Sequence, residues 1–180
     1  MDDRIKVVKL PIVGKVARIS DPGEALYLPD GLSFKTNLKI TLIGVDGKPK
    51  LTRDLGSGLI TTAGVNAIAA DFSGLGGVDI TNFKWHDAGT GTTAAAIGDT
   101  ALQTPSGMAR VSGSQTNPTA NTYLSTAVIP YTGAFNITEW AIFSASTVGT
   151  MLDHRVFGAQ AVANGESIFY QWTLTVNAGG

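Results

Sequence analysis

The sequence predicts an all-β fold: an antiparallel β-sandwich of jelly-roll type, with an extended N-terminal arm, a small hairpin unit and one or two short helices. From residue 79 onward, six segments rich in β-branched and aromatic residues alternate with Gly, Pro, Asn and Ser. In the last of them, residues 167–176, apolar side chains recur at every second position, as in a half-buried strand: Ile168, Tyr170, Trp172, Leu174 and Val176.

Three regions are expected along the chain: an arm and small β unit at 1–55, a linker with a short helix at 56–78, and the sandwich body at 79–180. Residues 5–14 are β-branched and basic with a central proline, which fits an extended arm or an edge strand. The alternating segment 38–43 is closed as a hairpin by the Asp-Gly-Lys-Pro turn that comes after it.

Two short helical segments are predicted. Thr61 or Thr62 is placed to cap a helix over residues 63–72, which stops at Ser73. Thr92 or Thr93 begins a capped turn or short helix over residues 94–102, lying across one end of the sheet. The six predicted strands of the body are 80–86, 108–112, 123–129, 136–143, 150–157 and 167–176.

Composition narrows the class of protein. The chain has no cysteine, which excludes disulfides and thiolate metal sites, and its net charge of −1 argues against a nucleic-acid or membrane-surface partner. Ten of its thirteen basic residues precede residue 56, so the body is poor in charge. Because charged groups are depleted at interface cores, this surface suits packing against copies or partners.

No apolar run approaches the roughly 18 residues that a membrane helix needs. Met1-Asp-Asp-Arg also lacks the apolar segment of a signal peptide. We therefore expect a soluble chain made in a cytoplasm.

The histidines do not predict catalysis. His86 precedes Asp87 and His154 comes directly after Asp153, but neighbouring residues of a strand point to opposite faces. A general acid–base pair must instead converge in one pocket. We expect no enzyme activity, no cofactor and no metal site, since Asp87 and Asp99 are too scattered to indicate a calcium site.

Two further features have a structural explanation. The Gly-rich run 87–93 would suit an anion on backbone amides, but it lacks the Lys-Ser/Thr of a phosphate loop, so we interpret it as a tight loop leading into the next segment. Glu139 and Arg155 are embedded in apolar strands, where charged groups need partners. We predict a structural ion pair between them across neighbouring strands.

Two ordered blocks carry a family resemblance. Residues 83–102 run from Phe-Lys-Trp-His through Gly-Thr-Gly-Thr to Gly-Asp-Thr-Ala-Leu, and residues 137–157 join Ile-Thr-Glu-Trp-Ala-Ile-Phe to Leu-Asp-His-Arg-Val-Phe. A closing Gly165-Glu-Ser-Ile and an alternating strand come after them. This set resembles structural proteins of tailed-bacteriophage particles. Where that family has His or a small residue and then Gly-Leu-Phe, this chain has Trp140-Ala-Ile-Phe.

The resemblance implies a virion component without catalytic residues. The leading hypothesis is a capsid decoration, or cement, protein on the outside of the head, made in the host cytoplasm, with the major capsid protein and its own copies as partners and a trimer favoured. The arm would add a strand to a neighbour. Its candidate capsid-binding residues are Arg4, Lys6, Val7, Val8, Lys9, Leu10, Ile12 and Val13.

Two alternatives stay open. The first is a tail, neck or baseplate adaptor or a fibre-associated module, because the resemblance does not separate head from tail. The second is a carbohydrate-binding sandwich on the particle surface, for which Trp85, beside the Gly-rich loop, is the candidate stacking residue; Trp140 and Trp172 are predicted to lie in the core.

Overall fold

The computed structural model describes residues 33–74 and 78–178, which form the sandwich body. The predicted arm, with its candidate capsid-binding residues between Arg4 and Val13, lies outside the described residues.

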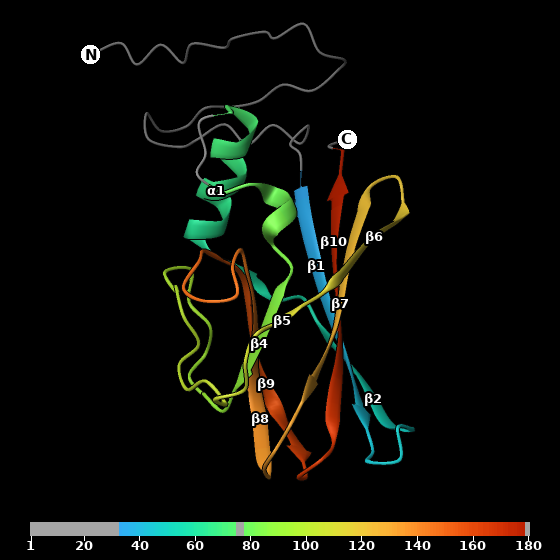
Figure 1. The fold of residues 1–180 in the computed structure, drawn as a ribbon. Coiled ribbons are helices and arrows are strands. Elements are labelled where there is room, and N and C mark those ends of the chain that lie inside the picture. The colour runs from blue at the N-terminus through green and yellow to red at the C-terminus, as the bar shows by residue number, and fades with distance from the viewer. Residues whose placement is uncertain (1–32, 75–77, 179–180) are drawn as a thin grey trace, which may run out of the picture. The chain divides into compact units, whose positions relative to one another are not determined.

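Two five-stranded antiparallel sheets pack face to face, which confirms the predicted β-sandwich (Figure 1). Sheet A has the order β2-β1-β10-β7-β6, with bounds Pro49–Gly56, Ser33–Ile43, Ser167–Asn177, Thr122–Pro130 and Ser114–Thr119. Sheet B has the order β3-β9-β8-β4-β5, with bounds Leu59–Ile60, Met151–Val162, Phe135–Phe143, Trp85–Gly89 and Val111–Ser112.

Aromatic side chains fill the space between the sheets. Trp140 projects inward from β8 and Trp172 and Tyr170 from β10, and all three are fully buried. The Trp140 ring stacks on Tyr170 at a centroid distance of 6.4 Å and lies 6.3 Å from Trp172. The predicted inward face of β10 is confirmed, and Trp140 and Trp172 lie in the core as expected.

The N-terminal hairpin belongs to the sandwich. The predicted turn is formed, with Gly47 at a φ of 75° between β1 and β2. However, β1 pairs with β10 along its whole length, from Ser33 opposite Asn177 to Ile43 opposite Ser167. The expected separation of residues 1–55 from the body therefore does not hold for this hairpin, because its inward residues complete the core of sheet A.

Helix α1, Thr62–Phe72, forms where the sequence places it. Thr61 is its N-cap, and its hydroxyl accepts a hydrogen bond from the Gly64 amide at 3.0 Å. The same hydroxyl donates to the Met151 carbonyl, which fixes the start of the helix on β9. Gly64 and Ile68 form the buried face of the helix.

Of the turn or short helix predicted over residues 94–102, the structure forms a turn, with the Asp99 amide bonded to the Ala96 carbonyl. One other prediction needs correction. The predicted strand 80–86 begins only at Trp85. Before it lies a short 3₁₀ helix, Ile80–Asn82, because the Asp79 carboxylate accepts hydrogen bonds from the Thr81 amide and hydroxyl.

Gly64→Ala tests the contact between α1 and β9. In an ordinary helix, alanine stabilises relative to glycine by about 1 kcal/mol. Here the new methyl group would lie 2.8 Å from the Leu152 Cα. We expect a net loss of about 1–3 kcal/mol in the free energy of unfolding, measured by urea denaturation. Gly98→Ala, whose methyl group meets nothing within 4 Å, is the control; equal effects of the two would contradict this packing.

Candidate functional site

The outer face of sheet B is covered by residues 90–106, which we call the strap. It is the loop that leaves β4 and runs beside β8 in Figure 1. Its two ends are joined to each other and to β4: the Thr90 amide donates to the Thr104 carbonyl, and the Ser106 amide donates to the Ala88 carbonyl. Glu139 and His154 of sheet B lie beneath it and contact its residues.

Glu139, fully buried on β8, anchors the strap. Its Oε1 accepts the amides of Gly91 at 2.9 Å and Thr104 at 2.8 Å, and its Oε2 accepts the amide of Gln103 at 2.9 Å. A register shift between Ile137 and Glu139 aims this side chain at the strap, as β-bulges commonly do. One carboxylate therefore satisfies three backbone donors of a single loop.

The two glycines of the Gly-Thr-Gly-Thr run are explained by this anchor. A methyl group on Gly89 would lie 2.3 Å from the Thr104 carbonyl oxygen and 2.5 Å from Glu139 Oε1. One on Gly91 would lie 2.6 Å from Glu139 Oε1. The run is the tight loop that the sequence predicts, and the anion on its backbone is the chain's own carboxylate.

His154, on β9, links the strap to the sheet a second time. Its Nδ1 lies 2.7 Å from Asp99 Oδ2, in the strap, and its Nε2 lies 3.2 Å from Glu139 Oε2. Asp99 Oδ2 also accepts the Ala96 amide. Burial raises the pKa of Asp99, but the hydrogen bonds from Ala96 and His154, with the positive charge of His154, outweigh it and lower that pKa overall.

A second ion pair borders this network. Arg110 Nε lies 3.0 Å from Asp87 Oδ2, and the guanidinium sits 3.4 Å from the centroid of the Phe143 ring. Burial raises the pKa of Asp87, and the hydrogen bond from Arg110 offsets part of that effect. Arg110 also donates to the carbonyls of Ala145 and Val148, so it holds the loop between β8 and β9.

The predicted ion pair between Glu139 and Arg155 is not formed. In the β8–β9 register, Glu139 lies opposite Val156 and Arg155 lies opposite Trp140, so the two side chains leave opposite faces of the sheet. Arg155 donates instead to the carbonyls of Leu55 and Ser57. It joins β9 to the end of β2.

The His–Asp neighbours are separated as expected. His86 points into the core, where its Nδ1 accepts the indole N–H of Trp140 at 3.3 Å and its Nε2 lies 2.8 Å from Ser125 Oγ. Because an indole nitrogen is a donor only, Nδ1 carries no proton and the ring is neutral. Burial lowers the pKa of His86 from 6.5 to about 3.

Asp153 also faces inward. Its Oδ2 accepts the indole N–H of Trp172 at 2.7 Å, a hydrogen bond that crosses from sheet B to sheet A. Burial raises the pKa of this carboxyl, and the bond from Trp172 opposes that rise. His86 and Asp153 therefore tie the two sheets together, while Asp87 and His154 serve the outer face.

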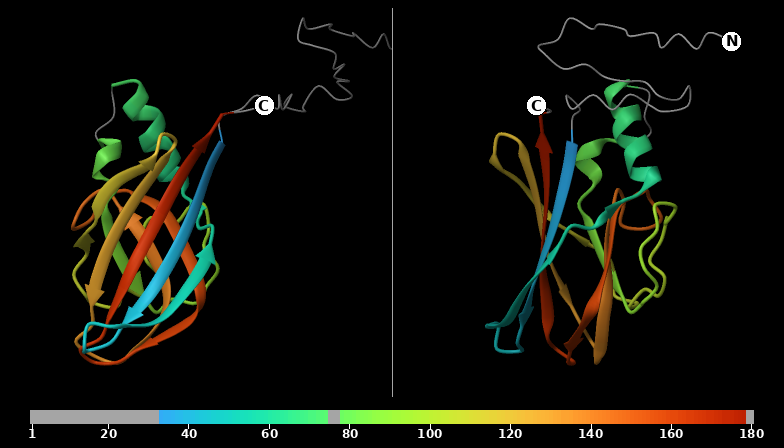
Figure 2. Two further views of the ribbon diagram at one scale, coloured as in Figure 1. Left: turned by 90° about the vertical axis from the view of Figure 1, so that its right-hand side faces the viewer. Right: turned by 180° about the vertical axis from the view of Figure 1, so that it is seen from behind.

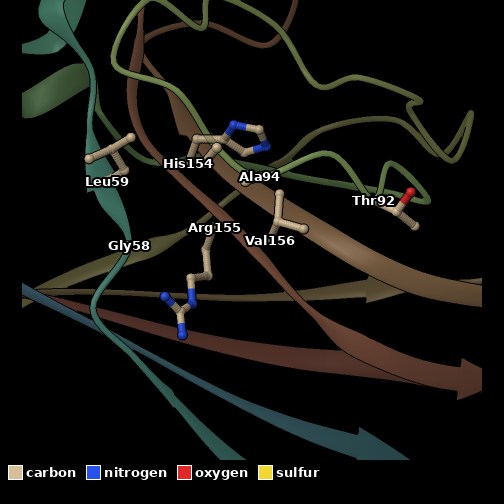
Figure 3. Close-up of a pocket in the computed structure, with 8 residues that line it drawn as sticks. Gly58, Leu59, Thr92, Ala94, His154, Arg155 and Val156 are labelled. Carbon is tan, nitrogen blue, oxygen red and sulfur yellow. The ribbon is translucent and has the colours of Figure 1, made fainter.

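A pocket of about 490 Å³ lies between the strap and strands β3 and β9 (Figure 3). Figure 3 shows the His154 and Arg155 side chains leaving β9 in opposite directions. Both nitrogens of the His154 ring are engaged by carboxylates, so the ring offers no free base to the pocket. The arrangement orders a loop against the sheet.

The other residues considered as candidate sites, Trp85, Asp87 and Asp99, make contacts within the body. Trp85 is partly buried and packs against Leu102, Ala141, Phe143 and Met151 on the outer face of sheet B. Asp87 and Asp99 have different partners, Arg110 and His154. Within residues 33–74 and 78–178, no group of three or more His, Asp or Glu side chains is placed to hold a metal ion. No helix of that part has the length and apolar character needed to cross a bilayer.

Comparison of the chain with models of known protein families, with curated proteins and with solved structures found no match. The similarity to phage structural proteins therefore stays a prediction from the sequence.

Glu139→Gln tests the anchor. The glutamine side chain has an NH₂ group in place of one carboxylate oxygen. At least one of the three strap amides that now donate to Glu139 would therefore lose its acceptor. We expect a loss of about 2–4 kcal/mol in the free energy of unfolding, measured by urea denaturation. Asp71→Asn, the matching loss of a carboxylate on α1, should stay within about 0.5 kcal/mol. Similar small effects in both variants would rule out the anchoring role.

His86 gives the protein a specific acid sensitivity. The pKa of His86 is lower in the folded chain than in the unfolded chain. Between these two pKa values, His86 binds a proton in the unfolded chain but not in the folded chain. Stability is full above pH 6.5 and falls toward pH 3, by about 1.4 kcal/mol per pH unit. His86→Gln keeps an acceptor for Trp140 and a donor for Ser125 but does not titrate. Urea denaturation at several pH values should give a flatter profile for this variant; parallel profiles would contradict the assignment.

Proposed function

We propose that this chain is a structural protein of a bacteriophage particle, a capsid decoration protein that binds the outside of the head and stabilises contacts between major capsid subunits. One observation carries the proposal: the outer face of sheet A is broad, open and poor in charge. Figure 2 (left) shows this sheet in front, with no helix or loop of the described body over it. The two outer faces of the sandwich thus differ, because the strap covers sheet B.

The composition of the open face suits a contact surface. Its outward positions are set by the strand register and alternate with the buried ones. Toward the end of the face where β10 begins, Phe169 and Val128 lie side by side on adjacent strands, and Val128 is 46% exposed. Lys35, Lys39 and Asp54 occupy outward positions of the paired strands, among threonines and other uncharged side chains. β2 also carries Lys50, which is exposed and pairs with Glu166.

The area of the open face is also large enough for a protein–protein interface. Strands about 4.8 Å apart with a rise of about 3.3 Å per residue give a face of about 800 Å², which matches one side of a standard protein interface. Binding that exists only in the assembled shell stabilises that shell, because anything that binds one state preferentially favours it. A decoration protein needs no other mechanism.

The residues that carry the resemblance have a structural role in the body. Gly89, Gly91 and Glu139 belong to its two blocks, and in the structure they fasten a loop to a sheet. His154 completes the same anchor. These residues shape the body, and specific attachment would come from the open face and from the arm that precedes Ser33.

Copy number tests the proposal. Heads and tails of particles that contain the protein are separated, and their protein composition is quantified. We expect on the order of hundreds of copies on each head. We also expect the heads to lose stability when these copies detach. About six or twelve copies fixed to tails would instead favour the adaptor. Binding to a glycan array that is lost in Trp85→Ala would favour the carbohydrate-binding alternative.

Thr173→Arg tests the open face itself. Thr173 lies outward on β10, the central strand of sheet A. A new charge at the centre of an interface is desolvated without a partner, so we expect binding to stripped heads to weaken by at least about tenfold. Asn66→Arg, the same added charge on the exposed side of α1, is the control. Thermal melting establishes that both variants fold, and equal binding by the two would exclude sheet A as the contact.

A further inference from the structure

We infer that the partner of sheet A is an acidic protein surface whose carboxylates lie opposite strands β1 and β2, and that this pairing of charges sets the orientation in which the body docks. The inference rests on the proposed function, because it takes the outer face of sheet A as the contact surface. The uneven distribution of charge within that sheet carries it.

Charge in sheet A is confined to one side. Strands β1 and β2, which form one edge of the sheet (Figure 2, left), carry all the charged residues of its five described strands: Lys35, Lys39, Lys50, Arg53 and Asp54. Strands β10, β7 and β6 carry none. Residues 33–56 hold five basic and two acidic groups, a formal charge of +3, whereas the rest of the described chain holds three basic and seven acidic groups, a formal charge of −4.

Lys35 and Lys39 are the outward cations of β1. Both are exposed, and neither makes an ion pair with another residue of the described chain. Lys39 lies opposite Asp54 on β2, and the carboxylate of Asp54 accepts the Gly56 amide at 3.0 Å. Lys35 lies beyond the part of β1 that pairs with β2, so no strand residue of β2 stands beside it. The outward charge of β1 and β2 is therefore positive in excess.

The other two cations of β2 differ in how they are held. Lys50 Nζ lies 2.5 Å from Glu166 Oε1, so a carboxylate of the chain balances its charge. Arg53 donates to the carbonyls of Gly158 and Ala159 on β9. A guanidinium stays protonated, and a carbonyl has no formal charge to balance it. The edge of the sheet at β2 is therefore positive as well.

The opposite side of the face is neutral. On β10 and β7 the outward residues include Thr173, Thr126 and the apolar pair Phe169 and Val128. These side chains can be desolvated without burying a charge, whereas a lysine in a contact requires an opposite charge. A partner with carboxylates opposite β1 and a neutral patch opposite β7 meets both conditions. The partner turned by half a turn meets neither, which fixes the orientation of docking.

A protein surface fits this charge better than a nucleic acid does. Binding to a phosphate backbone needs a basic stripe or patch. The outward cations here are few, Asp54 lies among them, and uncharged hydroxyl and amide side chains fill most of the face. Carboxylates placed at matching points satisfy two lysines without a continuous basic surface.

Lys35→Glu tests the charge pairing. At an ionic strength of about 0.01 M, where charges act over about 30 Å, we expect its association rate with stripped heads to be about fivefold lower than that of the unchanged protein. The difference should disappear at about 1 M salt, where charges act over only about 3 Å. Lys35→Arg, which keeps the charge, should bind at the original rate.

Lys84→Glu is the matched control. It makes the same change in net charge at the residue before β4, in the other half of the sandwich. Thermal melting establishes that all the variants fold. Equal slowing by Lys35→Glu and Lys84→Glu, an unchanged rate for Lys35→Glu, or a difference that persists at high salt overturns the inference, while binding to heads by itself upholds the proposed function.

A titration without heads separates the two proposals. Nuclear magnetic resonance follows the amide signals of the full chain as hexaglutamate is added at low salt. The signals of Lys35 and Lys39 should shift, and less so in Lys35→Glu, whereas that of Val65 on α1 should stay in place. Absence of shifts along β1, or tighter binding of a short DNA duplex there, overturns the inference. Shifts along β1 in a protein that does not bind heads uphold the acidic partner and reject the capsid.

Discussion

The burial of one carboxylate constrains the whole outer side of sheet B. A buried charge is costly unless hydrogen bonds replace its hydration, and Glu139 is fully buried on β8. Its oxygens are satisfied by three strap amides and by His154. The strap must approach closely to supply those donors, which is why glycines stand at 89 and 91.

The two histidines show how environment decides a role. His86 faces an indole donor in the core and is neutral. His154 faces two carboxylates on the outer side, with one at each ring nitrogen. The difference comes from the side of the sheet on which each ring lies. The inner ring ties sheet B to Ser125 of sheet A, and the outer ring ties it to the strap.

The body is therefore asymmetric about its core. Sheet B carries a third, partial layer formed by the strap, Arg110 and the apolar cluster around Phe143, whereas sheet A is bare on its outer side (Figure 2). The two outer faces also differ in their charged residues. On the covered face of sheet B, Glu139 contacts His154 and Asp87 contacts Arg110. This leaves an uncovered, sparsely charged outer face on sheet A and a strap-covered outer face on sheet B.

The sequence by itself determined the sandwich class, the inward face of β10, the location of α1 and the turn at Gly47, because each depends on local periodicity or on the conformational preference of a few neighbouring residues. It also showed that Glu139 and Arg155 need partners. Only the tertiary structure decided which partners these are, since the β8–β9 register sends the two side chains to opposite faces. It likewise decided that β1 extends the sheet of β10, and that the Gly-rich loop binds Glu139, 48 residues along the chain from Gly91. Such contacts join residues distant in sequence, and no local pattern specifies them.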